Sequence, residues 1–201
     1  MSKGIAFFDF DGTITTKDTM LQLVKFYKGK QAYYGGMLKL LPWLIGMKLN
    51  LVSNTLVKEK FLALFFKGMS IKTFQEVCDD FVKNALPQLI RPQALATIQQ
   101  LQQEGVSMVV VTASADNWVK GWCDCYGIAC IGSCLEVKEG KLTGKLNGAN
   151  CHKEEKVRRI KEQYQLSDFS TIYCYGDTKG DLPMLQLATH AFYKPFRDTT
   201  F

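Results

Sequence analysis

Acidic side chains follow apolar runs at two places far apart in the chain. Asp9 and Asp11 end the apolar run of residues 4–9, and Asp177 and Asp181 follow a second run near the C-terminus. Carboxylates beside buried strands are costly unless a cation pairs with them, and a hard cation with oxygen ligands is the usual solution. Because Mg²⁺ prefers oxygen ligands, the pattern predicts a magnesium site.

Three further residues suit phosphate chemistry. A carboxylate can attack phosphorus when a cation neutralises the phosphate oxygens and donors hold them in line. Lys156 and the Thr112 hydroxyl are suitable donors, and Gly12 lets the backbone approach a phosphate closely. Each residue alone is common as a turn, cap or solvated side chain. Their joint appearance at the ends of apolar strands favours a phosphoryl-transfer site.

Alternating strands and helices must position these residues. We expect strands at 4–9, 106–111 and 171–175, a hairpin at 135–146 that turns at Glu139-Gly140, and helices at 92–105, from Ser114 or Asp116 as cap to 127, 153–164 and 182–187. This alternation predicts an α/β fold, a Rossmann-like parallel sheet with helices on both faces. Ligands of such sheets bind beyond the carboxyl ends of the strands.

The block between the first two strands carries long apolar patterns at helical spacing and no convincing strand alternation. It predicts a helical cap inserted after the first strand. The expected domains are a catalytic core of residues 1–17 and 88–201 and a cap of residues 18–87. Because the cap would rest over the strand ends, we expect it to act as a lid.

Four motifs together resemble those of the haloacid dehalogenase superfamily of phosphohydrolases. They are DFDGTIT at 9–15, VVVTAS at 109–114, Lys156 and GDTKGD at 176–181. The helical insertion, the sequence CHKEEKVRRI around Lys156 and the GKLTG hairpin are similar to the phosphoserine-phosphatase-like branch, which also contains bacterial phosphatidylglycerophosphatases. The resemblance implies the superfamily's α/β core with a helical cap.

The resemblance also implies a function for each residue of the motifs. Asp9 would be the nucleophile that forms an aspartyl phosphate, and Asp11 would be the general acid and then the base. A second Asp at this position distinguishes the superfamily's phosphatases from its dehalogenases. Mg²⁺ would be held by Asp9, the main-chain carbonyl of Asp11 and Asp177, with Asp181 supporting the site. The residues that would bind the phosphoryl oxygens are Thr112, Ala113, Gly12 and Lys156.

Some positions depart from the branch's pattern. Its phosphoserine phosphatases hold the amino acid with an acidic residue after the first motif and an arginine in the cap. Here Asp18 stands near the acidic position, residues 18–87 contain no arginine, and Lys58 would be a weaker substitute. We therefore predict a phosphatase that is not specific for phosphoserine. Lys153 stands where relatives often have glycine. One interpretation of the neighbouring His152 is a contact with phosphate, and the one we favour is an exposed residue at a helix start.

The segment Met37–Val52 leaves two interpretations open. It is apolar on nearly every side, and residues 19–58 contain six lysines and no Asp or Glu. One interpretation is a buried helix pair broken at Pro42. The other is an interfacial segment that presents Trp43 to lipid while lysines meet anionic head groups, as in a lipid-phosphate phosphatase at the membrane surface. A non-catalytic binding protein with this fold is a third hypothesis.

Composition limits these possibilities. With 201 residues, 47% of them hydrophobic, the chain can bury one core with one insertion. Lysines interrupt its most apolar region, and the N-terminus runs straight into a strand, so we expect a cytoplasmic protein, at most peripheral at the inner membrane face. The expected partner is a phosphorylated small molecule or a lipid head group, not nucleic acid. The cysteines predict reduced thiols, with a zinc site at Cys123, Cys125, Cys130 and Cys134 as the alternative.

Overall fold

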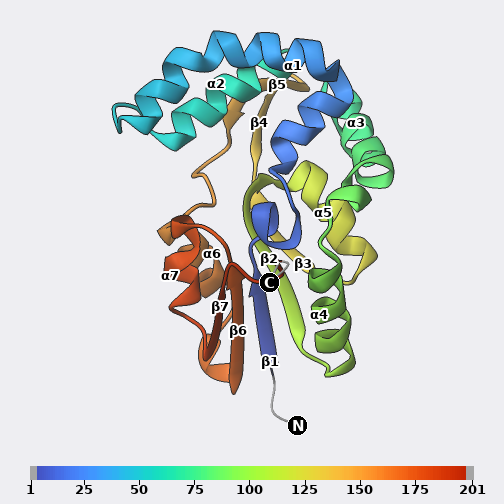
Figure 1. Cartoon of the computed structure of the whole chain (residues 1–201), viewed down its shortest axis with the longest axis vertical. Helices are drawn as coiled ribbons and strands as arrows, with labels where there is room; N and C mark the ends of the chain where they lie inside the picture. The colour runs from blue at the N-terminus through green and yellow to red at the C-terminus, as the bar shows by residue number, and fades with distance from the viewer. Residues whose placement is uncertain (1–3, 198–201) are drawn as a thin grey trace.

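A central parallel sheet organises the computed structural model, which describes residues 4–197. In this range the sheet has five strands in the order β3-β2-β1-β6-β7 (Figure 1). They are β1 (Gly4–Phe8), β2 (Ser107–Ala115), β3 (Ala129–Ser133), β6 (Thr171–Gly176) and β7 (His190–Tyr193). Every residue of β1 is buried, as expected for a strand covered on both faces. Because β2 and β6 flank β1 in parallel, the carboxyl ends of the three strands meet at one edge.

Helices cover both faces of the sheet, which confirms the predicted α/β class (Figure 1). On one face α4 (Pro92–Gln103) and α5 (Asp116–Cys125) pack in a cluster with Phe8. On the other, α6 (Glu154–Gln163) and α7 (Leu182–Leu185) pack with Phe7. Alternate residues of β1 therefore point into two separate apolar layers. Short helical turns lie at Phe10–Ile14, Leu86–Leu89, Leu166–Asp168 and Lys179–Asp181.

The insertion after β1 is helical, as predicted. It contains α1 (Thr19–Lys48), α2 (Asn54–Phe66) and α3 (Ile71–Asn84), which lie beyond the carboxyl edge of the sheet (Figure 1). The break at Pro42 that belongs to the buried-pair interpretation is wrong, because Pro42 lies inside α1 and the interruption falls at Gly29, with φ +80° and ψ 163°. Only glycine adopts that conformation readily, whereas an exposed proline removes a single amide donor.

The predicted hairpin consists of β4 (Leu135–Lys138) and β5 (Lys141–Leu146), which pair antiparallel. Its turn has positive φ at both Glu139 and Gly140, as a two-residue hairpin turn of type I′ requires. The hairpin packs against α2, and a Cβ at Gly144 would lie 2.6 Å from the Ala63 Cβ. Glycine at this position therefore allows the hairpin to brace the cap from below.

Two features differ from the sequence-based expectations. The strand β3 was not expected, because the sequence ACIGS is short and contains the small residues Ala129, Gly132 and Ser133. Helix α5 begins without a side-chain cap, so the prediction that Ser114 or Asp116 caps it is wrong. The Ser114 hydroxyl instead donates to Asp11 Oδ2 at 2.5 Å. The Ser114 hydroxyl thus makes a hydrogen bond to a residue distant in the sequence, which the local sequence does not reveal.

The turn before α6 places Lys153 at φ +56° and ψ −126°, a conformation that favours glycine. We expect Lys153→Gly to raise the free energy of unfolding by about 0.5–2 kcal/mol. Glycine removes the backbone strain from the folded chain, and this effect exceeds the cost of the greater freedom that glycine has in the unfolded chain. Urea denaturation measures the change. In the control Lys161→Gly, within α6, the free energy of unfolding should fall by about 1 kcal/mol. A loss of stability in Lys153→Gly would contradict the assigned strain.

Candidate active site

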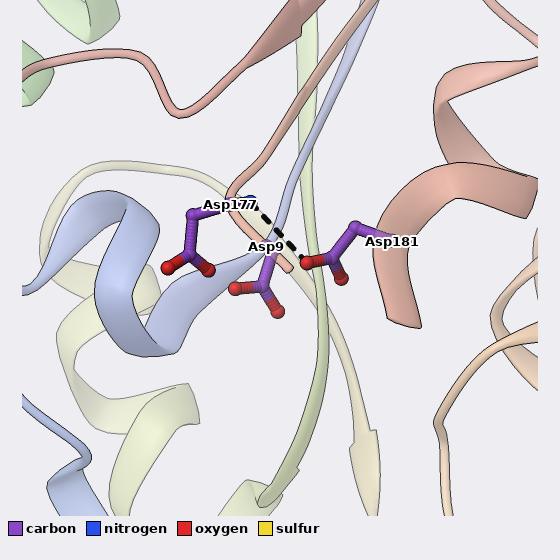
Figure 2. Close-up of side chains that lie close together, drawn as sticks. All are labelled: Asp9, Asp177 and Asp181. Carbon is purple, nitrogen blue, oxygen red and sulfur yellow. Dashed lines mark hydrogen bonds between the residues drawn. The ribbon is translucent and has the colours of Figure 1, made fainter. Parts of the chain in front are cut away.

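Three carboxylates converge at the carboxyl edge of the sheet (Figure 2). Asp9 follows β1, and its amide donates to the Tyr175 carbonyl at 2.8 Å, which ties the ends of β1 and β6 together. Asp177 and Asp181 follow β6. One oxygen of each carboxylate lies within 4.8 Å of those of the other two. This set of oxygen donors suits a hard divalent cation.

Among residues 4–197, no other group of His, Cys, Asp and Glu side chains gathers closely enough to hold a metal ion. The alternative of a four-cysteine zinc site is therefore wrong. Cys123 is buried, Cys125 is exposed, and Cys134 donates to Asp116. The cysteines thus behave mostly as small apolar residues of the core and its border.

Lys156 of α6 enters the acidic cluster from the side. Its Nζ donates to Asp9 Oδ1 at 2.6 Å and to Asp181 Oδ1 at 2.7 Å, and its side chain is 1% exposed. Burial alone would lower the pKa of this ammonium, but the two carboxylates raise it above its usual value. Lys156 is therefore a permanent positive charge between two carboxylates.

The three carboxylates differ in their electrostatic environments. Burial, opposed by Lys156, raises the pKa of Asp9 to about 7. Burial and the Asp181 charge also raise the pKa of Asp177. Burial acts on Asp181 too, but Lys156 and hydrogen bonds from Thr178 outweigh it and lower the pKa of that carboxyl. Asp181 is therefore held as an anion, whereas Asp9 is the carboxyl whose charged form an added cation would stabilise most.

Thr13 and Gly12 allow the loop after β1 to pack closely against the three carboxylates. The Thr13 hydroxyl lies 3.1 Å from Asp9 Oδ2 and 3.4 Å from Asp177 Oδ1. Gly12 has φ +85°, and a Cβ there would lie 2.6 Å from Asp177 Oδ2. The Gly12 amide donates to Thr15 Oγ1 at 3.3 Å. Glycine is thus needed for close approach to Asp177, and its predicted contact with phosphate stays a prediction.

The Asp11 carboxylate belongs to a different set of contacts. Its Oδ1 accepts hydrogen bonds from the amide and the hydroxyl of Thr19, both at 2.6 Å, and its Oδ2 accepts from Ser114. Trp118 Nε1 in turn donates to Thr19 Oγ1 at 3.0 Å. Thr19 is the first residue of α1, so Asp11 connects the acidic loop to the cap.

The two cap residues named from the sequence also lie near the site. Lys58 of α2 donates to the Ala113 carbonyl and, at 3.0 Å, to Asn150 Oδ1, and burial lowers its pKa to about 8. Asp18 caps α1 by accepting from the Leu21 amide at 3.0 Å.

A cavity of about 390 Å³ lies between the sheet edge and the cap. Most of the predicted site residues line this cavity, and they are Asp9, Asp11, Asp18, Lys58, Thr112, Ala113, Lys156 and Asp181. The Thr112 hydroxyl accepts from the Ser114 amide at 3.0 Å. Asp177 and Gly12 lie beside this space rather than in its wall.

Sequence reasoning missed several contributors. Arg197 donates to Asp177 Oδ2 at 3.1 Å, which only the position of the chain's closing segment reveals. In the same segment Phe196 stacks on Tyr175, and residues 198–201 lie outside the described residues. His152, expected to be exposed, is half-buried, lines the cavity and fills the space that a side chain at Gly180 would need.

Comparisons with known proteins agree with this fold and site. The chain matches the family of haloacid dehalogenase-like hydrolases over residues 6–186. It is 34% identical over 192 residues to Protein CicA of Caulobacter vibrioides (strain NA1000 / CB15N), covering 94% of this chain and 85% of that protein. It is 25% identical over 213 residues to the histidinol-phosphatase of Neisseria meningitidis serogroup C (strain 8013), with coverage of 93% and 88%.

Solved structures share the fold at low sequence identity. A protein of unknown function from Bordetella pertussis Tohama I has a TM-score of 0.80 at 20% identity, with 94% and 88% of the chains covered. A phosphoserine phosphatase solved as a phospho-aspartyl intermediate analogue has a TM-score of 0.63 at 21% identity, with coverage of 94% and 84%. The chain therefore belongs to the haloacid dehalogenase-like hydrolase family, as its motifs predicted, and is a phosphohydrolase with a phosphoserine-phosphatase-like fold.

The raised pKa of Asp9 predicts a pH-dependent stability. Between pH values of about 4 and 7 the folded protein keeps a proton on Asp9 that the unfolded chain has released, so stability falls as pH rises through this window. Because the amide of Asp9→Asn does not titrate, we expect the free energy of unfolding of this variant, relative to that of the unmutated protein, to rise by about 2–4 kcal/mol between pH 4 and pH 8.

Urea denaturation in EDTA at several pH values measures this difference. Asp80→Asn, which removes an exposed carboxylate of α3, is the control and should show no comparable pH dependence. A constant difference between Asp9→Asn and the unmutated protein from pH 4 to 8 would mean that Asp9 titrates normally in the folded state.

Proposed function

We propose that this phosphohydrolase is a Mg²⁺-dependent phosphomonoesterase that forms an aspartyl phosphate on Asp9. The observation that carries the proposal is the convergence of Asp9, Asp177 and Asp181 at one strand edge, with the Lys156 ammonium between two of them. Buried carboxylates in this number require added positive charge, and a hard divalent cation supplies it. The cavity above them provides room for a phosphoryl group.

The metal would be held by Asp9, Asp177 and the main-chain carbonyl of Asp11, with Asp181 supporting from close by. It would neutralise phosphate oxygens and so lower the repulsion that an attacking carboxylate meets. Asp181 is suited to support because its oxygens already accept from Lys156 and Thr178. Asp9, with its raised pKa, is the carboxylate that an added cation would ionise.

The proposed reaction has two steps. An oxygen of Asp9 attacks phosphorus, the bond to the leaving oxygen breaks, and Asp11 gives that oxygen its proton. Asp11 then takes a proton from water, whose oxygen attacks phosphorus and releases Asp9 and inorganic phosphate. Lys156, Thr112 and the Ala113 amide would bind the phosphoryl oxygens. Thr112 and Lys156 both line the cavity beside Asp9, which supports these assignments.

We further propose that residues 18–87 act as a lid on a core formed by residues 1–17 and 88–201. Two contacts between them support this division: Asp11 with Thr19, and Lys58 with the Ala113 carbonyl. Both join a cap helix to a segment at the carboxyl edge of the sheet, the loop after β1 or the end of β2, that would hold the phosphoryl group. Opening would break them, so closure and assembly of the site would be coupled.

The proposed substrate is a phosphorylated small molecule, and phosphoserine is a poor candidate. Residues 18–87 contain no arginine, and Lys58 already donates to Ala113 and Asn150. A lysine is also a weaker partner than arginine for a carboxylate, because it lacks the planar pair of donors. The histidinol-phosphatase similarity points to another phosphomonoester within the same chemistry.

We expect Asp9→Asn to lose all hydrolysis of an aryl phosphate in Mg²⁺, because an amide cannot form the aspartyl phosphate. EDTA should abolish turnover by the unmutated protein. Asp11→Asn is the matched variant: it should still incorporate label from a ³²P-labelled aryl phosphate but release phosphate slowly, because the base is missing. Acid-quench labelling and phosphate release measure the two steps. Turnover by Asp9→Asn, or normal phosphate release by Asp11→Asn, would overturn the corresponding assignment.

A lipid-phosphate phosphatase at the membrane surface is the second candidate, favoured by the outer face of α1. Tyr34, Leu38, Leu41 and Ile45 follow helical spacing and are 48–72% exposed on this face. Leu49 and Leu51, which follow α1, extend the exposed apolar surface. No helix in the described residues is long and apolar enough to cross a membrane.

Charge favours an anionic bilayer as the occupant of this face. The stretch from Thr19 to Lys58 contains six lysines and no Asp or Glu, so an anionic surface would attract it while its apolar residues enter the head-group layer. On this proposal the protein is cytoplasmic and touches the inner membrane face. The non-catalytic hypothesis has no comparable support, because the chain is a hydrolase of this family and retains its motif residues.

Co-sedimentation with vesicles tests the second candidate. We expect binding to vesicles containing anionic phospholipid, weaker binding to zwitterionic vesicles, and about tenfold weaker binding for the double variant Leu38→Glu, Leu41→Glu. Leu182→Glu, at an exposed leucine of α7 in the core, is the control and should bind normally. No sedimentation with anionic vesicles at moderate salt would remove this candidate.

A further inference from the structure

We propose that the cap forms an apolar pocket for the leaving group, so that the enzyme selects phosphomonoesters whose alcohol carries an alkyl body. This inference rests on the proposed phosphatase function and names its substrate class. It concerns the inner face of the cap and is independent of whether the outer face of α1 meets a membrane.

The walls of the cavity divide sharply by chemistry. The floor, at the sheet edge, consists of carboxylates, hydroxyls and Lys156. The opposite wall comes from α1 and α2. Apart from Asn54 and Lys58 of α2 it is apolar, and its apolar members are Met20, Leu21, Met37, Leu44, Met47, Val57 and Phe61. A phosphoryl group on the floor would therefore direct the rest of the ester against apolar side chains.

Three of these side chains are methionines. Their unbranched thioethers adapt to different shapes, so they suit a flexible alkyl group better than one rigid polar ligand. The cavity volume of about 390 Å³ lies within the range of about 300–1,000 Å³ usual for small-molecule sites. There is thus room for a phosphoryl group together with several carbons.

Three polar cap residues line the cavity, and two of them already have partners, whereas the third, Asn54, is exposed to solvent. Lys58 donates to the Ala113 carbonyl and to Asn150 Oδ1, and Asp18 accepts from the Leu21 amide. A carboxylate or second phosphate on the leaving group would also approach Asp18, whose negative charge repels it. An alkyl group would displace water from the apolar wall and leave no polar group without a partner.

Two adjacent residues of α1 separate the inner wall from the outer face. Leu44 is half-buried and lines the cavity, whereas Ile45 is 52% exposed and does not. The same polar substitution at the two positions has a similar effect on local helix propensity. The pair therefore distinguishes a pocket effect from a general change in the cap.

The experiment measures kcat/KM for ethyl, butyl and hexyl phosphate in Mg²⁺. The leaving alcohols of this series have similar reactivity, so differences report binding of the alkyl chain. We expect kcat/KM to rise about two- to fourfold for each added methylene until the cavity is full; fourfold corresponds to about 0.8 kcal/mol. Leu44→Gln should reduce the hexyl-to-ethyl ratio about tenfold, and Ile45→Gln should leave that ratio unchanged.

Met37→Gln is a second wall variant in case Leu44→Gln does not fold, and thermal unfolding checks both. A flat series in the unmutated protein, or an equal loss of the ratio in Leu44→Gln and Ile45→Gln, overturns the pocket. If neither the alkyl phosphates nor an aryl phosphate is hydrolysed, the phosphatase proposal itself fails. Comparing kcat/KM for dodecyl phosphate embedded in vesicles with kcat/KM for hexyl phosphate in solution shows whether the preferred alkyl phosphate is a lipid or a soluble molecule.

Discussion

Lys156 holds together the acidic edge on which the rest of the site depends. Parallel pairing brings the ends of β1 and β6 side by side, so three carboxylates meet where little water remains. Burial and mutual repulsion both disfavour their charged forms. One buried ammonium contacts two of the three, and breaking such a pair on one side typically costs about 3–5 kcal/mol. The strained turn at Lys153 is part of the loop that delivers this ammonium.

The same edge controls how the cap meets the core. Asp11 lies between Ser114 of β2 and Thr19 of α1, so its carboxylate joins the loop after β1 to the first turn of the cap by hydrogen bonds. Lys58 of α2 makes a second connection between cap and core, because its ammonium donates a hydrogen bond to the carbonyl of Ala113 in β2. The cap is therefore attached to the loop after β1 and to the end of β2, the segments proposed to hold the phosphoryl group, and its position and the geometry of those segments cannot change independently.

The sequence predicted the features that depend on local pattern. Apolar runs bounded by glycine located β1, β2 and β6, and parallel pairing then implied that Asp9, Thr112 and Asp177 share an edge. It could not predict contacts set by three-dimensional packing. The pairing of Arg197 with Asp177 joins residues that only the folded sheet edge brings together. Ser114 satisfied a cap pattern, but its hydroxyl bonds Asp11 across the sheet, because tertiary contacts override weak local preferences.

Helix α1 shows why apolar composition alone left two interpretations open. A helix that is apolar on all sides must bury all of them or meet something other than water. In α1, Leu40 packs in the core, Leu44 faces the cavity and Leu38 and Ile45 face outward. Its residues therefore serve packing, the inner wall and an exposed surface at once. Because these uses need the same residue types, only the position of each side chain around the helix separates substrate selection from contact with a membrane.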